Sequence, residues 1–365
     1  MAYANRRARP TVFYGICGEG LGHYSRATVL IQALLDAGYR VEIFTSRRVV
    51  ALCRKKFPDC LVHNVPGMHM CYLDSRLHLP YTTWNNMKSI VHGLTRFTLI
   101  TQRARRCHLI GIISDYEPLT SNTGILLRVP VIAFDHQQVI TECAVNKKMA
   151  SSFHRGLIRF SNTTTYPRPS ARIITSFFHP PWKKKRVNHD RLLIGPVLRP
   201  HVLNHKTEQG NHILVYQTSA TMASLQNILD MLPGEKRVYG ASETITGHHL
   251  LSFDERRFIH DLATCRFAVV NGGYSTLCEA LYFGKPIICF PFRNQAEQEI
   301  NAQYIHVSGF GEWYKSDGDP ALLDFSGFLR HEEQYRQQIT KNRIPCGNGR
   351  LKKYVLEYLN NVQMR

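Results

Sequence analysis

Short apolar runs alternate with helical patterns from the start of the chain. Residues 11–16 form an apolar run, and after a glycine-rich turn the apolar residues of 26–37 recur at helical spacing. Gly38 stands where a helix C-cap glycine is expected, and residues 40–45 form a second apolar run. This order predicts a βαβ unit whose two strands pair in parallel within a buried sheet.

The same alternation continues along the remaining chain. In the first half it predicts strands over 61–65, 109–114, 129–134 and 172–177 and a helix over 84–101. In the second half it predicts strands over 212–217, 236–239, 267–271 and 286–290, helices over 276–283 and 297–307, and a last amphipathic helix over 350–362. The chain is therefore expected to contain two α/β series, one after the other.

Proline and glycine residues separate the two series, and we place the linker around residues 196–210. A length of 365 residues suits two domains. We expect an α/β fold of two doubly wound domains, residues 1–196 and 211–349, and a last helix over 350–365 that could return to the first domain. Ligands of such folds bind beyond the carboxyl ends of the strands.

The composition is that of an ordinary globular protein, with 44% hydrophobic residues and a mean hydropathy of −0.24. No run approaches the roughly 20 apolar residues that span a bilayer, and the basic segment 1–10 lacks the apolar core of a signal peptide. The ten cysteines form no Cys-x-x-Cys pair, and none has the spacing to histidine of a zinc site. We therefore expect a reduced, cytoplasmic protein without a metal site.

The formal net charge of +19 is concentrated in the first half. Residues 1–198 contain 28 Lys and Arg against 10 Asp and Glu, whereas residues 199–365 contain 18 against 17. A field of this sign attracts polyanions such as an anionic phospholipid surface, nucleic acid or an acidic glycan. The alternative is scattered charge that only keeps the protein soluble.

A glycine-rich turn joins the first strand to the first helix. Such a turn lets a ligand approach the backbone, and the helix N-terminus offers N–H groups to an anion. A dinucleotide site would need an acidic residue after the second strand, but Arg47 and Arg48 follow it, so only an NADP site at Arg47 stays as an alternative. His23 could take a proton from an acceptor hydroxyl, or merely cap the helix. The turn contains Gly18, Glu19, Gly20 and Gly22.

The second series contains a longer motif between residues 267 and 302. The turn and helix N-terminus after its first strand would bind a diphosphate, with two hydroxyl groups as further donors. Glu279, about one turn into that helix, could accept hydrogen bonds from a ribose diol, and Glu297 with Gln298 could bind sugar hydroxyls. The alternative is an ordinary strand–turn–helix unit with a surface glutamate. The turn reads Asn271, Gly272, Gly273, Tyr274, Ser275 and Thr276.

This motif resembles the donor-binding motif of the UDP-glycosyltransferase superfamily and of the related lipid-linked N-acetylglucosaminyltransferase of peptidoglycan synthesis. Asn271 departs from the pattern, because many members have a phosphate-contacting histidine there, and Glu297 replaces an aspartate. The matching positions are Gly272, Gly273, Ser275, Glu279, Gly284, Pro286, Pro291, Gln298, Asn301 and Ala302.

The resemblance extends, in order, over most of the chain. Gly18–His23 is similar to the acceptor-side loop that carries the catalytic histidine, and Asp115 follows a strand where the family has the aspartate that orients this histidine. Thr218 and Ser219 lie in the region of a phosphate-facing loop, without its usual glycine. Phe253 lies in the region of a base-stacking aromatic residue. A poorly characterised bacterial and archaeal branch shares the signatures found here as Asp115–Pro118 and Asp135–Gln137.

The resemblance implies a GT-B architecture, in which two Rossmann-like domains face each other across a cleft. It also implies an inverting, metal-independent transfer of a sugar from a nucleotide, with UDP favoured; the nucleotide sugar is a substrate, so no cofactor is implied. His23 would deprotonate the acceptor hydroxyl, and Asp115 would stabilise the imidazolium. Supplementary acceptor-side residues would be Glu19, Glu117 and His136, each of which could equally serve local hydrogen bonding.

In this superfamily the first domain binds the acceptor, and here that domain has the positive charge. We therefore expect an anionic acceptor, or an acceptor in an anionic membrane, and a cytoplasmic protein that could associate with the inner face of that membrane. The helix over 84–101 could rest on such a surface or pack on the sheet. Three alternatives stay open: a glycosyltransferase that modifies nucleic acid, a nucleotide-sugar epimerase of the same fold, and a protein that only binds the nucleotide.

Overall fold

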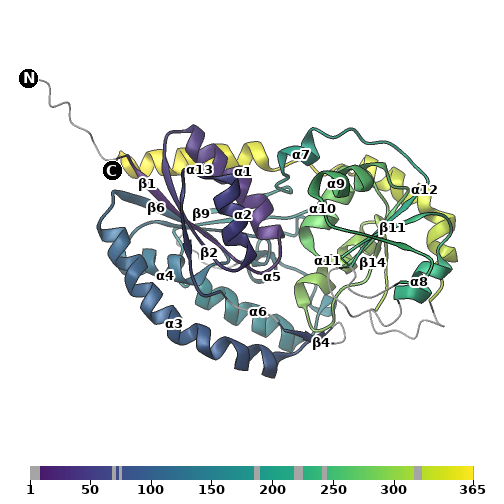
Figure 1. Cartoon of the computed structure of the whole chain (residues 1–365), viewed down its shortest axis with the longest axis horizontal. Coiled ribbons are helices and arrows are strands. Elements are labelled where there is room, and N and C mark those ends of the chain that lie inside the picture. The colour runs from purple at the N-terminus through teal and green to yellow at the C-terminus, as the bar shows by residue number, and fades with distance from the viewer. Residues whose placement is uncertain are drawn as a thin grey trace, which may run out of the picture.

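The computed structural model describes residues 9–67, 71–73, 76–184, 190–217, 225–240, 245–315 and 323–364. They form two halves that lie side by side, each with a parallel sheet between layers of helices (Figure 1). The expected α/β architecture of two Rossmann-like halves is therefore confirmed.

The first half is built on a seven-stranded parallel sheet in the order β3-β2-β1-β6-β7-β8-β9. Its central strands are buried on both faces, which is why they appear in the sequence as continuous apolar runs. The strand order reverses between β1 and β6, where doubly wound sheets bind ligands. The strands are β1 Thr11–Ile16, β2 Arg40–Thr45, β3 Leu61–Asn64, β6 Leu109–Asp115, β7 Val131–Asp135, β8 Ala171–Thr175 and β9 Asp190–Ile194, with a separate antiparallel pair of β4 Tyr72–Leu73 and β5 Arg76–Leu77.

Helices cover both faces of this sheet. One face packs against α1 Gly22–Asp36, α2 Arg48–Lys56 and α13 Asn348–Gln363, and the other packs against α3 Leu79–Arg105 and α4 Pro118–Leu127 (Figure 1). The remaining helices of this half are α5 Gln138–Glu142, the 3₁₀ turn η1 Lys147–Met149 and α6 Ser152–Thr165. In the described part of the chain, no helix is long and apolar enough to cross a membrane.

The second half has a six-stranded parallel sheet in the order β12-β11-β10-β13-β14-β15, which reverses between β10 and β13. The strands are β10 Ile213–Tyr216, β11 Lys236–Tyr239, β12 His249–Leu251, β13 Ala268–Val270, β14 Ile287–Cys289 and β15 Gly311–Trp313. The helices are α7 Pro200–Leu203, α8 Leu225–Met231, α9 Glu255–Thr264, α10 Tyr274–Tyr282, α11 Ala296–Val307 and α12 Ser326–Lys341.

The last helix, α13, packs on the first half. Its buried leucine and valine side chains, at Leu351, Val355 and Leu359, belong to the core that α1 and β1 also form. The fit is close, because a Cβ atom at Gly111 of β6 would lie 2.8 Å from Leu359 Cδ2. The Tyr39 hydroxyl donates a hydrogen bond of 2.7 Å to Asn360 Oδ1.

A buried junction joins the halves beside the carboxyl ends of both sheets. The His136 ring stacks on Tyr274 at 3.9 Å between centroids, and its Nδ1 lies 2.8 Å from the Thr175 carbonyl oxygen. Its Nε2 lies 2.9 Å from Asn301 Oδ1 of the second half. His136 therefore connects residues of both halves.

Candidate active site

A cleft lies between the two halves and is lined by residues of both. The first half contributes the glycine-rich turn and the start of α1, and the second contributes the starts of α10 and α11. Many predicted site residues are thus brought together: Glu19, Gly20, Gly22 and His23 face Phe253, Gly273, Ser275, Thr276, Glu279, Glu297 and Gln298.

His23 and Asp115 are in direct contact although 92 positions separate them in the sequence. β1 and β6 are neighbours, so the turn after β1 and the carboxyl end of β6 meet, and Asp115 is fully buried beneath His23. His23 Nδ1 lies 2.6 Å from Asp115 Oδ1. This contact orients the ring, and in the tautomer whose proton is on Nδ1 it leaves Nε2 as the nitrogen that could accept a proton.

Arg26 is a third member of this cluster, which the sequence analysis missed. The buried guanidinium donates to both carboxylate oxygens of Asp115, from Nε at 2.6 Å and from Nη2 at 2.5 Å, and Nη2 lies 2.6 Å from His23 Nδ1. Burial alone would lower the pKa of Arg26, but Asp115 raises it above its usual value. The available signal was its spacing, because a residue three positions after His23 shares its helix face.

The starts of α1 and α10 are close together across the cleft. A Cβ atom at Gly22 would lie 2.6 Å from Ser275 Oγ, so a larger residue there would displace this hydroxyl. Helices α1, α2, α10 and α11 begin at the cleft, and none of them accepts a hydrogen bond at its N-cap side chain. Their first N–H groups are therefore available to an anion, and the helix dipoles favour negative charge there.

Glu279 of α10 is buried and ion-paired. Arg199, which follows β9 in the segment between the two sheets, donates to Glu279 Oε1 at 2.8 Å and to Oε2 at 2.9 Å. The same guanidinium lies 3.1 Å from Glu255 Oε1. The sequence analysis missed Arg199, because an arginine in a linker looks like any solvated charge.

Aromatic side chains of the second half line the cleft together with Glu279. The Tyr216 ring lies 6.2 Å from Phe253 and 5.0 Å from Phe258 between centroids, and Phe253 is half-exposed. Arg48, at the start of α2, lines the same cleft and lowers the pKa of Tyr216 against the larger effect of burial, which raises it. Arg48 has no carboxylate partner among the described residues, whereas Arg26 and Arg199 have one.

Some predicted site residues lie elsewhere. His136 is part of the buried junction, and Gly272 packs under the backbone of Gln298. Asn271 donates to Gln217 Oε1 and to the Phe290 carbonyl oxygen. Thr218 and Ser219 lie outside the described residues. Among those residues, no group of three or more His, Cys, Asp and Glu is placed to hold a metal ion.

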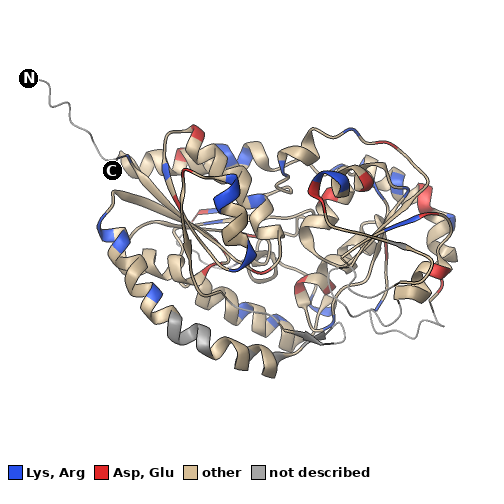
Figure 2. Ribbon diagram, in the orientation of Figure 1, with Lys and Arg blue, Asp and Glu red and all other residues tan. Residues whose placement is uncertain are grey.

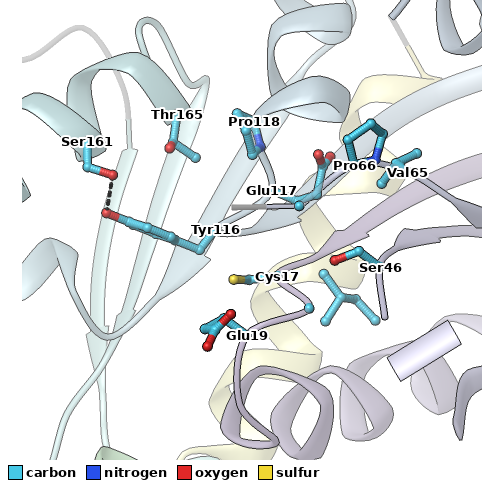
Figure 3. A pocket seen from close by; sticks show the side chains of 13 residues that line it. Cys17, Glu19, Ser46, Val65, Pro66, Tyr116, Glu117, Pro118, Ser161 and Thr165 are labelled. Carbon is cyan, nitrogen blue, oxygen red and sulfur yellow. Dashed lines mark hydrogen bonds between the residues drawn. The ribbon is translucent and has the colours of Figure 1, made fainter. Parts of the chain in front are cut away.

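A second, smaller pocket adjoins the cleft in the first half (Figure 3). It lies between the glycine-rich turn and α6, and Cys17, Glu19 and Tyr116 line both hollows. Gly18 and Glu117 belong to this pocket rather than to the main cleft. Glu117 also caps α4, because its carboxylate accepts from the Leu119 and Thr120 amides.

Two parallel α/β halves, with a cleft at the carboxyl ends of their strands, define the GT-B class of glycosyltransferases. The chain belongs to glycosyl transferase family 1, whose sequence profile matches residues 10–330. It is therefore a glycosyltransferase, and the expected enzyme class is confirmed.

Curated relatives span nearly the same length. An uncharacterized glycosyltransferase of Methanosarcina acetivorans is 22% identical over 356 residues, which cover 89% of this chain and 91% of the relative. One from Methanosarcina mazei is 23% identical over 353 residues, with the same coverage.

Solved structures share the fold at low identity. Arabidopsis thaliana UGT89C1 complexed with quercetin has a TM-score of 0.69 and 12% identity, and covers 96% of this chain and 99% of its own. Phytolacca americana UGT2, complexed with UDP-2fluoro-glucose and pterostilbene, has a TM-score of 0.66 and 11% identity. The match covers 92% of this chain and 94% of that structure. Acinetobacter baumannii MurG has a TM-score of 0.63 and 11% identity, and the match covers 96% of this chain and 99% of that structure.

Proposed function

We propose that this glycosyltransferase moves a sugar from a nucleoside diphosphate, with UDP favoured, to a hydroxyl group of an acceptor bound by the first half. One observation carries the proposal: the His23–Asp115 pair faces the uncapped N-terminus of α10 across the cleft. The residues before about 196 would form the acceptor domain, and residues 211–349 the donor domain. The complex of Phytolacca americana UGT2 with UDP-2fluoro-glucose supports the choice of UDP.

The proposed transfer is a single inverting displacement. His23 Nε2 accepts the proton of the acceptor hydroxyl as its oxygen forms a bond to the anomeric carbon of the sugar. The bond from that carbon to the diphosphate oxygen breaks, and the electron pair leaves with the diphosphate. The growing negative charge is met by the N–H groups of α10 and by the hydroxyls of Ser275 and Thr276, so that this route needs no metal ion.

Asp115 and Arg26 prepare His23 for this step. The carboxylate stabilises the imidazolium that forms, and the two hydrogen bonds from Arg26 hold that carboxylate in place. Glu279 is the acceptor for the ribose hydroxyls, and the half-exposed Phe253 ring is the surface on which the base stacks.

The first half also offers a surface suited to an anionic membrane. Large apolar side chains are exposed on two of its helices: Trp84 and Leu94 on α3 and Phe160 on α6 are each 70% exposed. Figure 2 shows Lys and Arg over the helices of this half, and the two signs mixed on the other. Apolar side chains with basic neighbours favour an interfacial location. We therefore place the acceptor at an anionic membrane surface.

The proposal is tested first on the donor. Calorimetry should detect binding of UDP to the purified chain and much weaker binding of uridine, because most of the proposed contacts are to the diphosphate. A screen of UDP-sugars should then give slow hydrolysis of one of them, and His23→Ala should reduce this rate by roughly 10² or more while the UDP affinity is unchanged. Absence of UDP binding, or an active His23→Ala variant, would refute it. Turnover to an epimeric UDP-sugar would indicate an epimerase instead.

A further inference from the structure

A second groove lies between the two halves and shares no lining residue with the catalytic cleft. Its walls come from three segments: the loop after β8, the end of α11 with the turn after it, and the segment between α12 and α13, which leads the chain back to the first half. The groove is open to solvent and offers about 620 Å³ to the centres of water molecules, which is in the size range of small-molecule sites. A small molecule can therefore bind here with one side in water.

The lining of the groove is largely aromatic. Phe177, Phe178 and Phe310 are buried in it, and the half-buried Tyr304 stacks on Phe178 at 3.7 Å between ring centroids. Val307, the last residue of α11, also lines the groove and is 62% exposed. Such a lining favours a flat apolar group, because the group would cover apolar surface and contact aromatic rings.

The charged side chains of the groove are cationic. Lys341 ends α12 and Arg343 follows it; both are exposed, and no Asp or Glu lines the groove. Neither forms an ion pair with a carboxylate among the described residues, and Arg343 lies over the Tyr282 ring, 5.8 Å from its centroid. Burial and, after it, the charge of Arg350 lower the pKa of His179, another lining residue, so a third cation is close by. The groove thus complements an anion.

Two helices end at the groove, and the negative end of a helix dipole disfavours an anion. Both ends are offset. The carbonyl oxygens of Tyr304, Ile305 and His306, in the last turn of α11, accept hydrogen bonds from the amides of residues 308–310. Lys341 supplies a positive charge in the last turn of α12. The side-chain cations therefore determine the sign of the charge that the groove prefers.

Aromatic rings connect this groove with the catalytic cleft. The Tyr274 ring lines the cleft and stacks on His136, which meets the edge of Phe178 at 5.6 Å between centroids. Phe178 in turn stacks on Tyr304, and both line the groove. Since Tyr274 and Tyr304 belong to the second half and the other two rings to the first, a ligand that packs on Tyr304 contacts the junction between the halves.

We propose that this groove is a second ligand site, for a small aromatic anion. A flat ring packs on the aromatic lining, and a carboxylate, sulfonate or phosphate group on that ring meets Lys341 and Arg343. The inference goes beyond the proposed function and does not depend on it, because the two hollows have no residue in common. Because the walls come from both halves, an occupied groove holds the halves in the arrangement described here.

Calorimetry with the full chain tests the ligand class. It compares naphthalene-2-sulfonate with naphthalene-2-sulfonamide, a neutral probe of the same shape, and with methanesulfonate, an anion without a ring. The aromatic sulfonate should bind roughly fivefold or more tightly than the sulfonamide at low salt, and the difference should shrink at high salt because exposed cations are screened. Methanesulfonate should not bind measurably. Equal affinities of the two aromatic probes, or binding of neither, would overturn the inference. Displacement of the sulfonate by UDP would place it in the cleft and would also overturn it.

Matched variants place the binding in the groove. Lys341→Gln should weaken binding of the sulfonate several-fold and leave the sulfonamide unchanged, whereas Arg330→Gln, at an exposed basic residue of the same helix outside the groove, should change neither. Val307→Glu puts an acid into the groove and should abolish the preference for the sulfonate. Leu126→Glu, at a residue of α4 that is 58% exposed, is its control. An unchanged sulfonate affinity in Lys341→Gln and Val307→Glu would refute the site.

Amide hydrogen exchange tests the hold on the two halves. The Gly347 amide donates to the Pro196 carbonyl oxygen at 2.8 Å, which ties the two connecting segments together beside the groove. Saturating naphthalene-2-sulfonate should slow exchange in residues 342–347 of the unmodified chain and not in Val307→Glu. Exchange that stays the same in the saturated, unmodified chain would contradict the inference.

Discussion

Arg199 holds both carboxylate oxygens of Glu279, through Nε at 2.8 Å and Nη2 at 2.9 Å. Both side chains are largely buried, so each charge is stabilised by its partner instead of by water. Arg199 belongs to the segment that joins the two sheets, whereas Glu279 belongs to α10 and lines the cleft from the second half. The pair therefore connects the linker directly with the residue proposed to bind ribose.

Replacement of Arg199 should affect stability and donor binding together. Arg199→Gln leaves a buried carboxylate without its partner, and loss of one member of such a pair costs roughly 3 kcal/mol. We expect a lower urea midpoint of unfolding and a weaker UDP affinity by calorimetry. Arg257→Gln on α9 is the control, because that side chain is exposed and forms only a long ion pair, with its Nε 3.9 Å from Asp261 Oδ2. Equal effects of both variants would contradict the prediction.

Arg48 should contribute to donor affinity through its charge alone. It lines the cleft without a carboxylate partner among the described residues, so a diphosphate is the anion that it could meet. Arg48→Gln should weaken UDP binding several-fold at low salt, on the order of 1 kcal/mol, and less at high salt because the site is exposed. Uridine binding should not change. Lys56→Gln, on the same helix and outside the cleft, should bind UDP as the unmodified chain does.

Acid should destabilise the first half through Glu42. Burial would raise the pKa of Glu42, but hydrogen bonds from His63 and Arg103 lower it from 4.5 to about 2. The folded state thus prefers the ionised form, so this stabilisation is present above pH 4.5 and is lost as the pH falls toward 2. The loss should be on the order of 2 kcal/mol.

Urea unfolding at several pH values would measure this effect. Glu42→Gln should be less stable at pH 7, yet lose less stability between pH 4.5 and 2 than the unmodified chain. Glu333→Gln, which changes an exposed carboxylate on α12, should keep the steep loss. If the free energy of unfolding falls with pH in parallel for Glu42→Gln and the unmodified chain, Glu42 does not cause the loss of stability in acid.

Membrane association should depend on the basic end of α3. Arg105 and Arg106 are exposed there, and each basic residue near an anionic surface contributes about 1 kcal/mol. The double change to Gln should lower sedimentation with vesicles containing 30% phosphatidylserine, at low salt, by roughly tenfold or more in partition coefficient. Changing Lys352 and Lys353 to Gln, on the opposite face of the sheet, should have little effect. Equal recovery with neutral vesicles would refute the membrane proposal.

The sequence predicted the buried framework well. Strands such as β1 and β7 are covered on both faces, so their whole length is apolar and visible as a run. Edge and short strands, such as β9 and β15, were not predicted because they are partly exposed and lack that continuity. Helix α2 was also missed, because its N-cap residue Arg47 has a φ of 59° and is not one of the residue types that usually cap a helix.

Residues proposed for the site were predictable where a glycine turn or a resemblance marked them. Arg26 and Arg199 could not be predicted, because the sequence alone does not distinguish a buried, ion-paired arginine from a solvent-exposed one. Only the fold brings Arg26 against Asp115, across 89 positions, and Arg199 against Glu279, across 80. The pocket at Tyr116 could not be predicted for the same reason, because segments from five parts of the chain form its walls.

The position of α13 bears on how the protein is made. Leu351, Val355 and Leu359 complete the core of the first half, yet they leave the ribosome after all of the second sheet. Until then the nascent first half exposes the apolar face that α13 later covers, while the second half can already fold. The first half can therefore complete its fold only after the second half has been synthesised. A chain that stops before residue 351 would expose the apolar core of the first half and would tend to aggregate.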